Sequence, residues 1–100
     1  MTSQLTLEEA LTAVEGAADQ RWMESCHEII RLLAFSGNKF TTDHVWQMLE
    51  ERGLSTKEPR AMGAAIRKLA NKKVIVGTGE YWNSARPECH SRPVKVWVRA

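Results

Sequence analysis

The chain has 100 residues, of which 43% are hydrophobic, and this size and composition suit one globular domain with one core. The formal net charge is only +2, but residues 1–51 carry three basic and nine acidic side chains, whereas residues 52–100 carry eleven basic and three acidic ones. The C-terminal half therefore has a net charge of +8, which predicts a surface for an acidic partner, most commonly nucleic acid.

The N-terminal segment begins MTSQLTLEEALTAVEG, with acidic residues and no long apolar run. The sequence therefore predicts neither a secretion signal nor a membrane span. Two cysteines, Cys26 and Cys89, are too few for a disulfide scaffold, so a reducing cytoplasm is the simplest location.

The first predicted element is an acidic helix within residues 1–18. Thr6 and Glu9 have the spacing of a capping box, which places the helix start near Leu7. Leu7, Leu11 and Val14 then share one helix face. This stripe either pairs two copies of the chain, binds another protein or packs on the chain's own core. Residues 19–100 form the main domain.

Two further helices are predicted before a connection at residues 54–58. The first carries an apolar stripe and is either separate from the preceding helix or its continuation beyond a kink near Gly16. It ends at Ser36-Gly37, where glycine can adopt the left-handed cap conformation. The second begins after a Thr41 cap, with Asp43 in its first turn, and ends at Gly53. The stripe of the first helix consists of Trp22, Cys26, Ile29, Ile30 and Leu33.

The next helix is predicted over residues 59–71. Pro59 suits its first turn, and Glu58 lies outside it because a residue before proline avoids helical angles. Its inward face carries Met62, Ala65, Ile66 and Leu69, whereas its outward face carries Arg60, Ala64, Arg67 and Asn71, flanked by Gly63 and Lys68.

Residues 74–82 and 94–100 have the β-branched and alternating patterns of two strands in a hairpin. Tyr81 and Trp82 are expected to close the core beside Trp97. Three helices followed by a hairpin predict an α+β fold of the winged helix-turn-helix type, in which helix 59–71 enters the major groove of DNA.

The loop of residues 79–93 is the wing of this predicted fold. Arg86 and Arg92 are expected to reach phosphates or a narrow minor groove, and Pro87 and Pro93 limit the freedom of the loop. The predicted DNA contacts are Arg60, Gly63, Ala64, Arg67, Lys68, Asn71, Lys72, Lys73, Arg86 and Arg92. Arginine suits guanine, asparagine suits adenine, and lysines suit phosphates.

Zinc and catalysis are both disfavoured. Cys26-His27 and Cys89-His90 are adjacent pairs, whereas structural zinc sites separate the two ligands of a pair by two to four residues. Cys26 is instead expected to be a small apolar residue on its helix face, and His90 to bond within the loop. No nucleotide-binding loop, nucleophile motif or pair of catalytic acids occurs, so we expect neither an enzyme nor a cofactor.

The segments FTTDHVWQML, EPRAMGAAIRKL and SARPECHSRPVKVWV resemble small winged-helix proteins of actinobacterial bacteriophages and mobile elements. The resemblance covers residues 22–99, and its most specific part is the pattern S-x-R-P-x-x-H-x-R-P-x-x-V-W. It implies a DNA-binding fold in the cytoplasm of a bacterial host. Motif matching points to Phe40, Asp43, Pro59, Ala61, Gly63, Arg86, Pro87, His90, Arg92, Pro93 and Trp97.

Two functions remain open at this point. The first is a double-stranded DNA-binding module that acts in phage gene control or replication, either alone or as a dimer formed through the N-terminal stripe. The second is a protein-interaction winged helix whose basic face docks an acidic host or phage protein. The steep salt dependence of duplex binding distinguishes them.

Overall fold

The structure of the chain is a computed structural model that describes residues 20–87 and 91–100. Helices α2 (Gln20–Phe35), α3 (Thr42–Glu51) and α4 (Arg60–Asn71) precede strands β1 (Ile75–Asn83) and β2 (Pro93–Arg99). This order confirms the α+β class. The predictions for Leu7, Leu11, Val14 and the rest of the N-terminal helix lie outside the described residues, as do those for Cys89 and His90.

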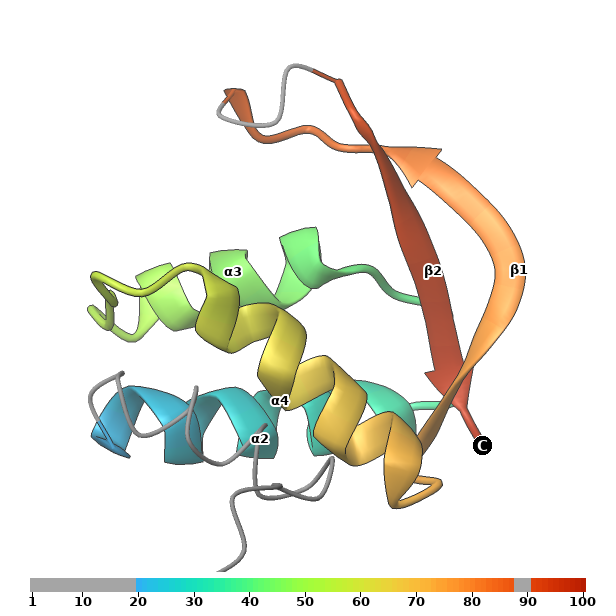
Figure 1. Cartoon of the computed structure of the whole chain (residues 1–100), viewed down its shortest axis with the longest axis horizontal. Helices are drawn as coiled ribbons and strands as arrows, with labels where there is room; N and C mark the ends of the chain where they lie inside the picture. The colour runs from blue at the N-terminus through green and yellow to red at the C-terminus, as the bar shows by residue number, and fades with distance from the viewer. Residues whose placement is uncertain (1–19, 88–90) are drawn as a thin grey trace, which may run out of the picture.

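The three helices pack together, and the hairpin stands along one side of them (Figure 1). α2 contacts both α3 and α4, β2 contacts α2, and β1 contacts α4. The far end of the hairpin curves back above α3. The basic C-terminal half thus supplies α4 and the whole hairpin, whereas the acidic half supplies α2 and α3.

The helix ends follow the predicted signals. The Thr41 hydroxyl accepts a hydrogen bond from the Asp43 backbone N–H at 3.2 Å, and His44 Nδ1 accepts one from the Thr41 backbone N–H at 3.0 Å. His44 therefore completes a capping box in the place usually taken by Glu or Gln. Gly53 ends α3 with a φ of 72°, and Pro59 occupies the cap position of α4, which confirms both predictions.

The core combines side chains from every element. Cys26 is fully buried, and its Sγ lies 3.8 Å from the Met62 sulfur, as expected of a small apolar residue between helices. The predicted α2 stripe is buried apart from Leu33, which packs at the edge of the core. The largest fully buried side chains are Trp22, Phe40, Ile29, Ile30, Leu49, Leu69, Ile75, Val45 and Val96.

The hairpin is antiparallel, and a short segment before α3 pairs with its second strand. Phe40 and Trp97 exchange two backbone hydrogen bonds, at 2.9 Å and 2.8 Å. This bridge ties β2 to the chain that enters α3. It therefore fixes the base of the hairpin relative to the helices.

The expectation that Tyr81 and Trp82 close the core is wrong. Tyr81 is 62% exposed and Trp82 is 38% exposed. The register shifts between Gly77 and Tyr81, so residues 78–80 of β1 stand opposite a single residue of β2. The prediction relied on the tendency of aromatic side chains to pack in a core, but Tyr81 pairs with Lys95, on the face of the hairpin opposite the buried Val96.

Among the helices of the described ranges, none combines the length and the apolar character needed to cross a bilayer.

Candidate nucleic-acid interface

The exposed face of α4 is narrow and basic. Residues 60–73 carry five basic side chains and no acidic one. Arg60, Gly63, Arg67 and Asn71 are exposed, and their spacing places them in one row along the helix. We call these four residues the α4 stripe. Met62, Ala65, Ile66 and Leu69 are buried on the other side of the helix, as predicted.

The expectation that Ala64 faces outward is wrong, because its exposed fraction is only 6%. Ala64 lies outside the main core cluster, so it is not an anchor of the helix packing. A methyl group is short, and on a helix it lies between the side chains one turn away on either side, here Arg60 and Lys68. Ala64 is therefore not available for a contact at the surface.

Gly63 is the central feature of the stripe. A Cβ atom built on Gly63 would have no atom within 4 Å apart from its own helix backbone. Glycine in a helix interior costs roughly 0.5–1 kcal/mol relative to alanine. Neither packing nor a positive φ requires glycine at this position. The result is a length of uncovered helix backbone between Arg60 and Arg67.

The C-terminal end of α4 shows the reverse case, in which a residue other than glycine occupies a position that favours glycine. The Lys73 N–H donates to Ala70 O at 3.0 Å and the Val74 N–H donates to Leu69 O at 2.9 Å, which is the pattern of a Schellman motif. Lys73 occupies the left-handed position with a φ of 61°. α3 ends in the same pattern with Gly53 at that position. A lysine there costs about 1 kcal/mol of strain.

Most polar side chains at this end of α4 are unengaged. Within residues 20–87 and 91–100, the side chains of Arg67, Asn71, Lys72 and Lys73 make no hydrogen bond or ion pair, and all four are exposed. Lys68 is half-buried. Cations in the last turn also interact favourably with the helix dipole.

Arg60 is exposed but engaged. Its guanidinium donates to both carboxylate oxygens of Glu58, at 2.9 Å and 3.0 Å, and its backbone N–H donates to the same carboxylate at 3.3 Å. The side-chain hydrogen bond from Arg60 holds the pKa of Glu58 below its ordinary value, so Glu58 stays ionised at neutral pH. Arg60 therefore reaches a partner only by sharing or leaving Glu58.

The chain that leaves β1 is tied to the start of α3. The Ser84 hydroxyl lies 2.9 Å from each carboxylate oxygen of Asp43, and the Ala85 backbone N–H donates to Asp43 Oδ2 at 2.9 Å. Ser84 is buried, with 5% exposure. Sequence reasoning missed this contact, although both residues belong to the motifs that carry the family resemblance.

Arg86 does not project outward as predicted. Its Nη1 lies 2.9 Å from Glu50 Oε1, its guanidinium carbon lies 5.0 Å from the centre of the Trp46 ring, and its side chain is 21% exposed. Arginine stacks well on an aromatic ring while pairing with a carboxylate, and α3 offers both groups. Arg86 is thus a brace between the hairpin connection and α3. Arg92 is exposed, as predicted.

A cavity of about 590 Å³ joins the α4 stripe to Arg86. Gly63 and Arg86 both line it, with Trp46, Leu54, Pro59 and Met62 as apolar lining. The stripe and the β1–β2 connection therefore border one concave surface.

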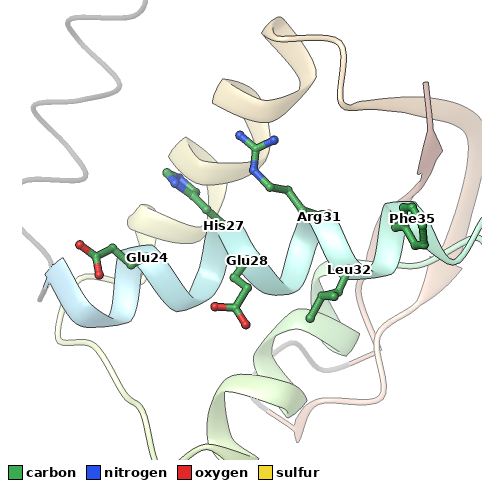
Figure 2. Close-up of a pocket in the computed structure, with 6 residues that line it drawn as sticks. All are labelled: Glu24, His27, Glu28, Arg31, Leu32 and Phe35. Carbon is green, nitrogen blue, oxygen red and sulfur yellow. The ribbon is translucent and has the colours of Figure 1, made fainter.

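A second hollow, of about 540 Å³, lies along α2 (Figure 2). Leu32 and Phe35 are its exposed apolar residues, at 49% and 81% exposure. Its other side chains are Glu24, His27, Glu28 and Arg31. This hollow has no excess of positive charge, so it does not suit an acidic partner.

The described residues contain no group of three or more His, Cys, Asp or Glu side chains that could hold a metal ion. Comparisons with protein-family models, with curated proteins and with solved structures found no match. The functional argument therefore rests on the chain's own residues.

Proposed function

We propose that the chain is a winged-helix protein that binds double-stranded DNA, with α4 in the major groove and the β1–β2 connection as the wing. The order of three helices and a hairpin supports this fold, and so does the Phe40–Trp97 bridge beside β2. Gly63 and Arg86 border one concave surface, which supports a single partner that contacts both α4 and the β1–β2 connection.

Gly63 is the observation that carries the proposal. An uncovered backbone costs the isolated protein stability, and a partner that approaches the helix closely offsets that cost. The floor of a major groove is such a partner, since an α-helix fits into it and its walls are lined by phosphates. Lys73 supports the same conclusion, because its strained position keeps a positive charge where glycine would be more stable.

The polar residues of the stripe and the basic residues near it have distinct roles in this proposal. Arg67 is the leading base reader because its guanidinium is unengaged and suits a bidentate bond to guanine. Asn71 suits adenine, whereas Lys72, Lys73 and Arg92 suit phosphates. Arg60 is paired with Glu58, so it contacts DNA only if it shares or breaks that ion pair. Arg86 positions the wing instead of touching DNA.

We further propose a role in phage gene control or replication inside a bacterial host, and this part rests on the motif resemblance alone. Residues 1–18, with Leu7, Leu11 and Val14, are proposed to pair two copies or to bind another protein. A dimer would read two half-sites.

The salt dependence of duplex binding tests the proposal. The wild-type chain should bind a duplex of random sequence at low salt, and its affinity should fall steeply as salt rises because counterions are released from the phosphates. Arg92→Ala, which removes a proposed phosphate contact, should weaken binding and flatten the slope. Arg31→Ala, at an exposed arginine on α2, is the matched control and should change neither. A wild-type chain that does not bind the duplex at low salt would favour the rival function, docking to an acidic protein.

A further inference from the structure

One face of the hairpin displays an aromatic ring beside a lysine. Tyr81 stands directly opposite Lys95 in the strand pairing, so their side chains lie on the same face of the sheet. Trp97 is two residues from Lys95 on β2 and shares that face. We call Tyr81, Lys95 and Trp97 the hairpin aromatic face.

The lysine is held in place by the strand beside it. Lys95 Nζ lies 5.0 Å from the centre of the half-buried Trp97 ring. A Cβ on Gly77 would lie 3.2 Å from Lys95 Cε, so the absence of a side chain there gives the lysine stem room to cross β1. The ammonium group therefore lies beside the Trp97 ring.

Tyr81 is the unpartnered member of this face. It is 62% exposed, and it is the first paired residue of β1 after the register shift. A tyrosine side chain combines a flat apolar ring with a polar hydroxyl, and tyrosine is enriched at surfaces that bind a partner. Tyr81 pairs with Lys95 just after the register shift, so it lies on the face of the hairpin opposite the buried Val96.

The charge of the hairpin indicates which partner fits. The described hairpin residues, 75–87 and 91–100, include four basic side chains and one acidic one. The acidic residue, Glu80, is paired with Lys39 at 2.6 Å, and this hydrogen bond lowers the pKa of Glu80. Lys95 and Arg99 remain exposed on the same strand. An exposed ring flanked by cations suits a polyanion with accessible ring faces.

We infer that the hairpin aromatic face binds single-stranded nucleic acid, with an unpaired base stacked on Tyr81 and a phosphate at Lys95. In a duplex the faces of the bases are covered by their neighbours, so only an unpaired base can stack on this ring. Aromatic stacking beside a positive groove is the usual basis of single-strand binding without sequence preference. This activity is additional to the duplex contact proposed for α4 and uses different residues.

Three probes of equal length, about 15 nucleotides each, test the inference by fluorescence anisotropy. The first is an oligothymidylate, the second has abasic sites in place of the bases, and the third is a duplex. The wild type should bind the oligothymidylate more tightly than the abasic strand, because the two strands share phosphates and differ in bases.

Substitutions at Tyr81 then assign the contact. Tyr81→Ala should weaken oligothymidylate binding by about tenfold and leave duplex binding unchanged, whereas Tyr81→Phe should keep the wild-type affinity because the ring remains. Lys72→Ala, at a proposed phosphate contact of α4, should do the reverse, losing duplex affinity only. Since the Tyr81 side chain is largely exposed, the far-UV circular dichroism and the melting temperature should not change.

Either of two results overturns the inference. Equal binding of the abasic strand and the oligothymidylate would show that bases are not stacked. Unchanged oligothymidylate binding by Tyr81→Ala, with the fold intact, would show that this ring is not the platform. Duplex binding by the wild type is a separate measurement, so failure of this inference and failure of the proposed function are distinguishable.

Discussion

The hydroxyl of Ser84 lies 2.9 Å from both carboxylate oxygens of Asp43, although 41 residues separate them in the chain. Asp43 is in the first turn of α3, and Ser84 follows the last residue of β1. One carboxylate therefore sets where the chain leaves the hairpin relative to the helices. The brace of Arg86 on Glu50 and Trp46 reinforces this position.

Loss of the Asp43 carboxylate should destabilise the whole fold. Asp43→Ala leaves the buried Ser84 hydroxyl and the Ala85 N–H without their acceptor, and hydrogen bonds to charged groups contribute about 1.5–3 kcal/mol. The free energy of unfolding from urea denaturation should fall by that amount. Glu51→Ala, at an exposed acid of the same helix, should change it by less than about 0.5 kcal/mol. Equal effects would show that the Asp43 contact is unimportant.

We expect Arg86 to contribute to stability and Arg92 to contribute to DNA binding. Arg86→Ala removes an ion pair and a ring contact, so the melting temperature should fall while the salt slope of duplex binding stays unchanged. Arg92→Ala should leave the melting temperature unchanged and make the slope shallower by roughly 0.9, the value for one phosphate contact. The opposite pattern in calorimetry and binding titrations would refute these assignments.

The sequence predicted the helices and strands more accurately than it predicted which side chains are exposed. Local signals such as the Thr41 cap, Gly53 and Pro59 act over a few residues, so they could be read directly. The exposure of Tyr81 depends on its pairing with Lys95, on the face opposite the buried Val96, and the sequence of β1 alone does not contain that pairing. The inward turn of Arg86 depends on Glu50, which lies 36 residues away. The left-handed position of Lys73 was missed because glycine is the usual signal there.

Release of Arg60 should strengthen duplex binding. Glu58→Gln removes a negative charge beside the α4 stripe and frees a guanidinium, so the salt slope should steepen by roughly 0.9. Because hydrogen bonding to Arg60 lowers the pKa of Glu58, the ion pair persists above the ordinary glutamate pKa and is lost only as pH falls through the lowered value. The difference between wild type and Glu58→Gln should therefore stay constant across neutral pH. Glu24→Gln on α2 is the control.

Lys73→Gly should stabilise the protein and weaken its binding. Glycine relieves the strain of the left-handed position, and the net gain in unfolding free energy should reach up to about 1 kcal/mol. The same change removes a phosphate contact, so the salt slope should become shallower by roughly 0.9. Lys73→Asn, which also tolerates this conformation, should lose the contact too. A more stable variant with undiminished binding would show that Lys73 has no role at the interface.

The most direct measurement compares stability and duplex affinity for Gly63→Ala and Gly63→Leu. Both variants should be more stable than the wild type, by up to about 1 kcal/mol, because helix propensity rises and a Cβ at this position meets no neighbouring atom. Gly63→Leu should nevertheless lose at least about tenfold in duplex affinity, since its side chain keeps α4 away from the groove floor. Gln20→Leu, at an exposed neutral position on α2, should bind as the wild type does. A folded Gly63→Leu variant with wild-type duplex affinity would contradict the proposal that α4 docks there.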